Sequence, residues 1–181
     1  AYLVQVMGVS PASILAVTFT NKAAKEMQER VNQLLGSQAS NITLGTFHNF
    51  GARILRHYGD ILGIDKQFVI YDDDEQKSIV KQSLEELSLD PKPYSPSAIN
   101  NAISAAKNKM LRPSEHAAHA KSYFDEIVNR VYVRYEKALF DNHALDFDDL
   151  LLKTVLLFQS DQNVLERYQN RYKFLMVDEW Q

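Results

Sequence analysis

The sequence predicts an α/β fold in which a parallel sheet is interrupted by an all-helical insertion. Three short runs rich in β-branched and apolar residues, at 14–19, 42–47 and 68–71, alternate with segments of helical periodicity, and a fourth run occupies 174–177. The runs are continuously apolar rather than alternating, which is typical of parallel strands covered on both faces. Only helical periodicity is found over 72–141. Strands that alternate with helices indicate a layered, parallel architecture.

Size and composition exclude several classes of protein. The chain has 181 residues, 45% hydrophobic and 24% charged, which is enough to bury a core. It contains no Cys, which excludes disulfide scaffolds, Cys-ligated zinc and thiol catalysis. We see neither an apolar run near the ~20 residues of a membrane helix nor a secretory leader, and expect a cytoplasmic protein without a membrane partner. The net charge of −3 indicates that any anion site is local.

Helical periodicity defines the elements between the first three strands. A helical stripe at three-to-four spacing follows the first strand, formed by Ala24, Met27, Val31, Leu34 and Leu35, and Gly36 is a typical helix stop. The segment after the second strand has the same spacing and ends near residue 63. Together these segments predict a βαβαβ order.

Acidic residues at 72–75 mark the start of the helical part, because they can cap a helix. A further helix is predicted to begin at Asp146, where Asp149 three residues later completes a variant of the capping box. The other helices are expected near 74–88, 96–110 and 114–140.

These elements predict an α/β domain built from 1–71 and 142–181, with a helical insertion at 72–141. The chain begins without Met and stops two residues after an acidic pair. We therefore expect it to be a piece of a longer protein.

The last apolar run is followed directly by Asp178 and Glu179. Two carboxylates then lie at the carboxyl edge of a parallel strand, which is where open α/β sheets bind ligands. One carboxylate there can hold Mg²⁺ against nucleotide phosphates, and its neighbour can orient or deprotonate an attacking water. The alternative is a strand that ends in two solvated acids, and this segment alone does not decide between them.

Polar residues also follow the first two strands. Residues 18–22 offer hydroxyls, an amide, an ammonium group and helix N-terminal N–H groups, which suit a phosphate backbone, while Phe19 offers a face for base stacking. Residues 45–49, with Thr46 and His48, repeat this layout. The alternative is a pair of ordinary capped helices, with Phe19 in the core and His48 in a packing or surface role.

Two further groups of charged residues lie in or beside the insertion. Lys107, Lys109 and Arg112 form a basic cluster that either contacts duplex phosphates or is a solvated helix face. The carboxylates of 146–149 either bind a metal ion or cap a helix, and capping explains them at lower cost.

Several long motifs, in order, resemble the first RecA-like domain of the UvrD/Rep/PcrA family of superfamily I DNA helicases. The segments AVTFTNKAAKEM, LGTFHNFGARILR and FLMVDEWQ resemble motifs Ia, Ib and Walker B. SAAKNKMLRP and NHALDFDDLLL are especially similar to the PcrA branch. The resemblance covers nearly the whole chain and implies an incomplete RecA-like sheet with a helical insertion that faces duplex DNA.

The resemblance also implies roles for individual residues and a pair of cofactors, ATP and Mg²⁺. Asp178 would bind Mg²⁺, and Glu179 would activate water for ATP hydrolysis. The parent protein would move 3′-to-5′ on single-stranded DNA, in repair or replication, and would meet duplex junctions. The single-stranded DNA track would be lined by Phe19, Thr20, Asn21, Lys22, Thr46, His48 and Phe147.

One departure from the family pattern is important. The chain has no GxxxxGK[ST] segment, which cradles nucleotide phosphates, so we expect the isolated chain to be inactive as an ATPase. Three alternatives stay open. They are a helicase–nuclease subunit of a recombination complex, a non-catalytic DNA-binding module, and a P-loop NTPase without a nucleic-acid partner.

Overall fold

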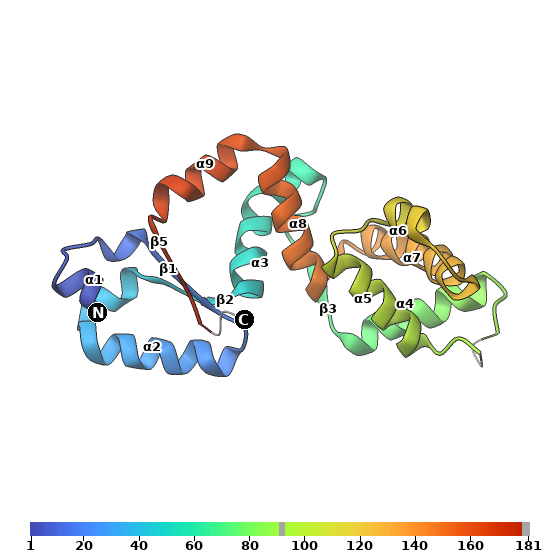
Figure 1. Cartoon of the computed structure of the whole chain (residues 1–181), viewed down its shortest axis with the longest axis horizontal. Helices are drawn as coiled ribbons and strands as arrows, with labels where there is room; N and C mark the ends of the chain where they lie inside the picture. Colours follow the sequence, from blue (N-terminus) through green and yellow to red (C-terminus); the bar gives the residue numbers. More distant parts are fainter. Residues whose placement is uncertain (91–92, 179–181) are drawn as a thin grey trace. The chain divides into compact units, whose positions relative to one another are not determined.

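The computed structural model describes residues 1–90 and 93–178 and divides the chain into two compact units. The sheet unit comprises 1–54 and 156–181, and the helical unit comprises 55–155. The α/β fold class and its parallel strands are confirmed. The sequence analysis placed residues 55–71 and 142–155 in the α/β domain, whereas the structure places them in the helical unit. The reason is that the third predicted strand packs with the helices (Figure 1).

The sheet unit is built on three parallel strands in the order β2-β1-β5. The strands are β1 (Ile14–Thr18), β2 (Thr43–Thr46) and β5 (Phe174–Val177). The helices that contribute to this unit are α1 (Tyr2–Gln5), α2 (Asn21–Leu35), α3 (Phe47–Tyr58), α8 (Phe147–Ser160) and α9 (Gln162–Arg171), with short 3-10 segments η1 (Pro11–Ser13) and η2 (Gly36–Asn41).

Alternate residues of the central strand β1 serve two different cores. Ile14 packs on the side of α2 with Leu35, whereas Leu15 and Val17 pack on the side of α3 and α9 with Tyr172. Figure 1 shows α2 on one side of the sheet and α3 on the other. All five residues of β1 are buried, as the continuous apolar pattern predicts.

The prediction of two covered faces is wrong for β5. Leu175 is 69% exposed and Met176 is 46% exposed, although both belong to an apolar run. The strand pairs with β1 along one edge only, in the register Ile14↔Phe174 to Val17↔Val177. An apolar run predicts a strand, but which of its faces is covered depends on packing partners that the run itself does not encode.

Within the described residues, the helical unit holds four whole helices and a small sheet, together with the end of α3 and the first part of α8. Its core is formed by residues of α4, α5 and α7, including Val80, Ile99, Val128, Val131 and Tyr135. The elements are α4 (Asp73–Glu86), α5 (Pro96–Asn108), α6 (Pro113–His119), α7 (Tyr123–Asp141), η3 (Gly59–Leu62), β3 (Val69–Tyr71) and β4 (Ala144–Asp146). Acidic residues cap the start of α4, as predicted, and Asp72 and Glu75 do so as a capping box.

The third predicted strand does not join the main sheet. It forms β3, which pairs in parallel with β4 in the register Val69↔Ala144 to Tyr71↔Asp146. Strand β4 was not predicted, because only two apolar residues, Ala144 and Leu145, mark it in the sequence. This small sheet places Asp146 beside β3 and at the start of α8.

The long helix predicted near 114–140 is two helices. Ser122 caps α7, its hydroxyl accepting the N–H of Asp125 at 3.1 Å, and the Asp125 carboxylate accepts the N–H groups of Lys121 and Ser122. These polar bonds start a new helix, whereas Ala120 has an extended backbone (φ −59°, ψ 126°). Apolar residues of α7 are buried in the core, among them Ile127, Val128, Val131 and Leu139.

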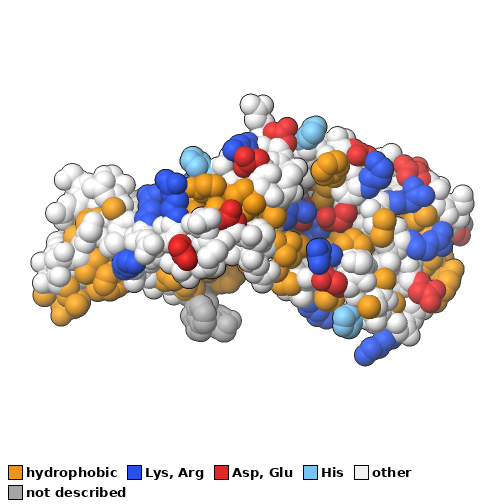
Figure 2. Space-filling view, turned by 90° about the horizontal axis from the view of Figure 1, so that it is seen from above, with side chains coloured by type: hydrophobic (Ala, Val, Ile, Leu, Met, Phe, Trp, Pro, Cys, Tyr) orange, Lys and Arg blue, Asp and Glu red, His pale blue; other side chains and the backbone are white. Residues whose placement is uncertain are grey.

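Charges are mixed on the surface. Figure 2 shows a face on which Lys and Arg side chains stand among Asp and Glu side chains, without a large patch of one sign. Within 1–90 and 93–178, no helix is both long enough and apolar enough to cross a membrane.

Candidate functional site

The carboxyl ends of the three parallel strands meet at one edge of the main sheet. The registers Thr18↔Thr46 and Val17↔Val177 bring the ends of β1, β2 and β5 level. The residues that follow each strand therefore share this edge, which we call the carboxyl edge. It is the side of an open α/β sheet at which ligands bind.

Phe19 is an exposed aromatic residue at the carboxyl edge. Its side chain is 56% exposed, whereas Thr18 just before it is 2% exposed. The Phe19 ring lies 5.2 Å, between centroids, from that of Phe47, with 50° between the ring planes. The alternative that Phe19 is a core residue is therefore wrong. The strand's burial ends at Thr18, and the structure leaves Phe19 with a surface on which a base can stack.

Two threonines at the carboxyl edge cap the helices that start there. Thr20 Oγ1 accepts the N–H of Ala23, and Thr46 Oγ1 accepts the N–H of Asn49, each at 3.1 Å. Thr20 is exposed, but Thr46 is only 3% exposed. The expectation that the Thr46 side chain lines a DNA track is therefore contradicted, because its hydroxyl is buried and engaged in capping.

The other predicted contacts at this edge come from the first turns of two helices. Asn21 and Lys22 begin α2 and are exposed, and His48 is half-buried in the first turn of α3. The N-terminus of a helix presents backbone N–H groups and the positive end of its dipole, and Lys22 adds a full charge. These groups suit an anionic ligand such as a phosphate.

Asp178 stands at the same edge, directly after β5. Its backbone N–H donates to the carbonyl of Val17 at 3.1 Å, which holds it against β1, and its side chain is exposed. A single carboxylate fits Mg²⁺ in a nucleotide site, since this ion keeps several waters and binds substrate phosphates. Glu179, the predicted activator of water, lies outside the described residues.

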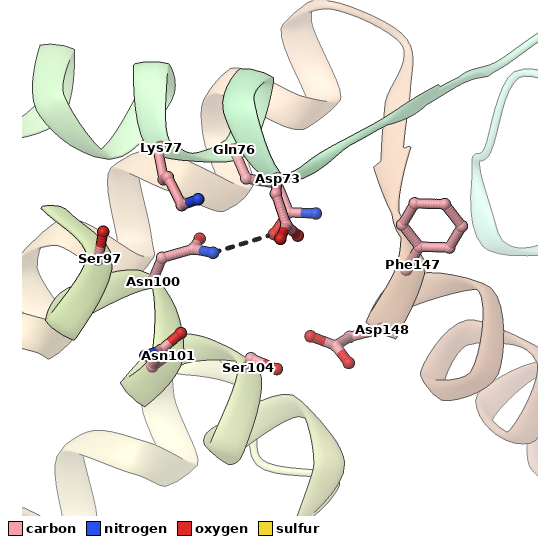
Figure 3. A pocket seen from close by; sticks show the side chains of 9 residues that line it. All are labelled: Asp73, Gln76, Lys77, Ser97, Asn100, Asn101, Ser104, Phe147 and Asp148. Atoms are coloured by element: carbon pink, nitrogen blue, oxygen red, sulfur yellow. Dashed lines mark hydrogen bonds between the residues drawn. The ribbon is translucent and has the colours of Figure 1, made fainter.

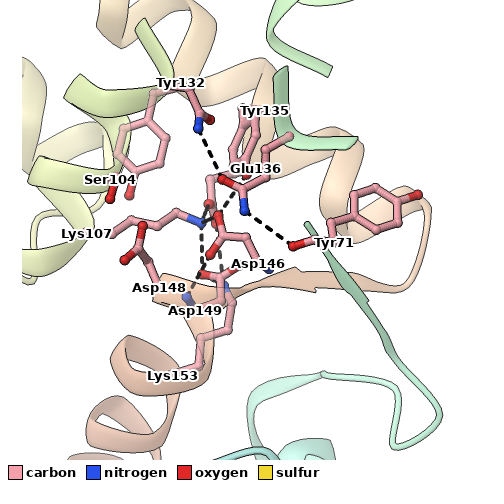
Figure 4. A network of polar contacts seen from close by, with 12 residues as sticks. Tyr71, Ser104, Lys107, Tyr132, Tyr135, Glu136, Asp146, Asp148, Asp149 and Lys153 are labelled. Atoms are coloured by element: carbon pink, nitrogen blue, oxygen red, sulfur yellow. Dashed lines mark hydrogen bonds and ion pairs between the residues drawn. The ribbon is translucent and has the colours of Figure 1, made fainter. Parts of the chain in front are cut away.

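Lys107 is not part of an exposed basic cluster. Its Nζ lies 2.7 Å from Asp146 Oδ2, 2.7 Å from Glu136 Oε1 and 3.0 Å from Asp149 Oδ1. Figure 4 shows the ammonium group among these carboxylates. The prediction of a duplex contact is wrong for Lys107, because its side chain is 1% exposed and its charge is compensated inside the helical unit.

The remaining members of the predicted cluster stay at the surface. Lys109 is exposed and forms no ion pair with any residue in the described ranges. Arg112 pairs with Glu115 at 3.2 Å, so part of its charge is balanced locally. What remains is one exposed lysine and one paired arginine, not a concentrated cationic patch.

The acidic residues at the start of α8 form a cap, as the sequence analysis favoured. Asp146 Oδ1 accepts the N–H of Asp149 at 2.7 Å, and Asp149 Oδ2 accepts the N–H of Asp146 at 3.4 Å. Tyr135 adds a hydrogen bond from its hydroxyl to Asp146 Oδ2 at 2.8 Å. Across 1–90 and 93–178, no group of three acidic or histidine side chains is arranged for a metal ion.

The buried charges shift each other's pKa values. Burial lowers the pKa of Lys107, but the three carboxylates, Asp149 foremost, outweigh burial and raise it well above its usual range. Burial raises the pKa of Asp149, yet Lys107 and Lys153 bring it below its usual range. The pKa of Asp146 is raised, by burial first and then by the charge of Asp149. Lys107 and Asp149 are therefore an ionised pair at neutral pH.

Phe147 lies in the helical unit, at the mouth of a polar pocket of about 340 Å³. Its ring is 46% exposed, and it follows Asp146 at the first position of α8. Figure 3 shows Asp148 directed across this pocket toward side chains of α4 and α5, with the ring of Phe147 beside it. The sequence analysis did not find the pocket, because its lining comes from three segments far apart in the chain.

The sequence profile of the UvrD/REP helicase N-terminal domain matches residues 1–181. The chain belongs to this family. It is 46% identical over 181 residues to the ATP-dependent DNA helicase PcrA of Bacillus subtilis and 44% identical to that of Staphylococcus aureus strain Mu50. These matches cover 100% of the chain but only 24% and 25% of the two relatives. The chain therefore spans about a quarter of the length of the curated relatives it matches.

Membership of the UvrD/REP helicase family fits the layout of the sheet unit. Three parallel strands with polar residues at one edge are consistent with part of a RecA-like domain. The structure brings Phe19 and Asp178 to that edge, whereas Phe147 belongs to the helical unit. Sequence analysis missed Phe47 as the partner of Phe19, although the two phenylalanines stand at equivalent positions, each one residue after its strand.

Proposed function

We propose that this chain is the part of an ATP-dependent DNA helicase in which nucleotide chemistry meets single-stranded DNA. The observation that carries the proposal is the match of the UvrD/REP helicase N-terminal domain to the whole chain. The names of its relatives, ATP-dependent DNA helicases, give the proposed reaction. The exposed polar and aromatic groups at the carboxyl edge are the groups that such a reaction needs.

At this edge Asp178 is proposed to hold Mg²⁺. The ion would neutralise charge on the ATP phosphates and fix their position. Glu179, next in the chain, is proposed to position and deprotonate the attacking water. The backbone bond from Asp178 to Val17 supports this role because it holds the residue that carries the carboxylate against the end of β1.

Single-stranded DNA is proposed to contact both units. In the sheet unit the proposed contacts are Phe19 for stacking, with Asn21, Lys22 and His48 for the backbone and the hydroxyl of Thr20 beside them. In the helical unit Phe147 is the proposed stacking residue, and Lys109 and Arg112 are the proposed contacts to duplex DNA at a junction. Lys107 and the hydroxyl of Thr46 are left out because both are buried.

The finer functional assignments follow from the family resemblance. We propose 3′-to-5′ movement on single-stranded DNA and a role in repair or replication. We also propose a cytoplasmic location. The 181-residue chain by itself is expected to hydrolyse no ATP, since it contains no GxxxxGK[ST] segment to cradle the phosphates.

The test is strand displacement by the full-length parent protein. Duplexes with a 3′ or a 5′ single-stranded tail are incubated with ATP and Mg²⁺, and the released strand is measured. We expect release from the 3′-tailed duplex only, and its loss in Asp178→Asn. Release without ATP, or equal release from both duplexes, contradicts the proposal.

A further inference from the structure

Phe19 and Phe47 stand side by side because the strands before them are in register. Thr18 is level with Thr46 in the parallel ladder, and each phenylalanine is the next residue along the chain. The two ring centroids lie 5.2 Å apart, with 50° between the planes. This distance is within the range of roughly 4.5–7 Å over which aromatic rings attract each other. The pairing of β1 with β2 therefore brings the two rings into contact.

The two rings differ in what surrounds them. Phe19 is 56% exposed, whereas Phe47 is half-buried. Phe47 packs against the buried cluster formed by Leu15, Val17 and Tyr172. It is also the first residue of α3, so its backbone belongs to a helix. Phe47 is thus anchored in the core of the sheet unit, and Phe19 contacts it at the surface.

The space between the two rings is too narrow for a base. Carbon atoms in contact lie about 3.5–4.0 Å apart, so a base held between two rings would need them about 7–8 Å apart. At 5.2 Å between centroids the rings of Phe19 and Phe47 contact each other directly. A base can therefore stack only on the exposed surface of Phe19, while Phe47 supports that ring.

Support of this kind matters because Phe19 is exposed. An exposed side chain without a neighbour samples several rotamers, and stacking on a base would have to fix one of them. Ordering a side chain on binding lowers affinity by roughly two- to tenfold. A ring that is already held by an aromatic neighbour avoids much of this loss.

We propose that Phe47 is a positioning residue for single-stranded DNA. It holds the ring of Phe19 in the orientation that stacks on a base, and it does not itself touch the DNA. The inference rests on the proposed function, which assigns stacking to Phe19, and it adds a residue that acts through Phe19 alone.

The experiment is a double-mutant cycle in the full-length parent protein, with ATP hydrolysis titrated by oligo(dT). Phe47→Leu removes the ring and keeps an apolar side chain in the core. We expect it to raise the DNA concentration needed for half-maximal stimulation by roughly two- to tenfold and to leave the maximal rate unchanged. In the Phe19→Ala background it should have no further effect, because the ring that it positions is gone.

Two variants control for the loss of packing. Phe47→Tyr keeps the ring and should need no more DNA than the wild type. Phe50→Leu is the matched control, because Phe50 belongs to the same helix and packs against the same cluster, but its ring pairs with those of Tyr168 and Tyr172. It should leave the DNA requirement unchanged. Thermal unfolding of each variant measures the packing loss separately, and Phe47→Met repeats the test if Phe47→Leu does not fold.

Several results would overturn the positioning role and leave the proposed function standing. One is an equal rise in DNA requirement for Phe47→Leu and Phe50→Leu, which would show a general effect of packing. Another is a further loss from Phe47→Leu in the Phe19→Ala background, which would show that Phe47 touches DNA itself. A lower maximal rate at an unchanged DNA requirement would assign Phe47 to ATP hydrolysis instead. A wild-type protein that DNA does not stimulate overturns the proposed function, and the positioning role with it.

Discussion

The ammonium group of Lys107 donates to Asp146 Oδ2 at 2.7 Å, with both side chains buried. This bond joins the last turn of α5 to the residue that caps α8, and Phe147 follows directly. A second bond, from Asn108 to Asp148 at 3.2 Å, joins the same two elements. The position of Phe147 in the helical unit therefore depends on the buried ammonium group of Lys107, whose charge is balanced by the carboxylates around it.

Replacing Lys107 with Met should destabilise the chain strongly. The change leaves Asp146 and Asp149 buried without their main cationic partner, and breaking a buried ion pair costs about 3–5 kcal/mol. The free energy of unfolding can be measured by urea denaturation. Lys109→Met is the matched control, because Lys109 is exposed, and it should change stability by less than about 0.5 kcal/mol. Equal effects of the two substitutions would show that the buried network is not needed for the fold.

The difference in stability between the wild-type protein and Lys107→Met should also be smaller in mild acid than at neutral pH. In the native protein Lys107 and Lys153 outweigh burial and keep the pKa of Asp149 low, so this group contributes stability that is lost as pH falls through its folded pKa. Without Lys107, burial dominates and the folded pKa rises. A carboxylate with a raised pKa is destabilising at neutral pH, and protonation removes that cost. Urea unfolding of both proteins from pH 8 to pH 4.5 should show a narrowing difference, and a constant difference contradicts this account.

Phe19→Ala should weaken binding to single-stranded DNA by ~1–3 kcal/mol with little change in stability, because the ring is already 56% exposed. DNA affinity and thermal unfolding are measured on the same variant of the full-length parent protein. Phe140→Ala is the control, since Phe140 is 71% exposed on α7 and is not among the residues of the carboxyl edge. A loss of stability of ~3–5 kcal/mol with unchanged DNA affinity would indicate a core role instead.

Thr46→Val should lower stability and leave DNA affinity unchanged, which is the reverse of the result expected for Phe19→Ala. It removes the hydroxyl that caps α3 and keeps the side-chain volume, so the expected cost is about 0.5–2 kcal/mol of stability. The DNA affinity of the folded protein should not change, because Thr46 is 3% exposed. A variant that keeps its stability and loses DNA affinity would restore Thr46 to the DNA track.

Local patterns account for the elements that the sequence predicted well. Continuous apolar runs predicted β1 and β5, and the acidic residues at 72–75 predicted the start of α4. The spacing of Asp146 and Asp149 predicted the start of α8. In each case neighbouring residues decide the structure, so the signal is visible in one stretch of sequence.

Features that depend on distant residues could not be predicted in this way. A lysine in a polar helix segment is ordinarily exposed, and the burial of Lys107 is explained only by Asp146 and Asp149, about forty positions further along the chain. The separate pairing of β3 with β4 and the exposure of Leu175 likewise depend on which elements pack together.

The central claim is that the carboxyl edge joins ATP hydrolysis at Asp178 to single-stranded DNA at Phe19. It is tested most directly by the rate of ATP hydrolysis in the full-length parent protein, titrated with single-stranded DNA. The account predicts that DNA stimulates the wild-type protein and that Asp178→Asn abolishes hydrolysis with or without DNA. Phe19→Ala should keep the basal rate but need more DNA for half-maximal stimulation, by roughly five- to a hundredfold. Hydrolysis at the wild-type rate in Asp178→Asn, or an unchanged DNA requirement in Phe19→Ala, would contradict it.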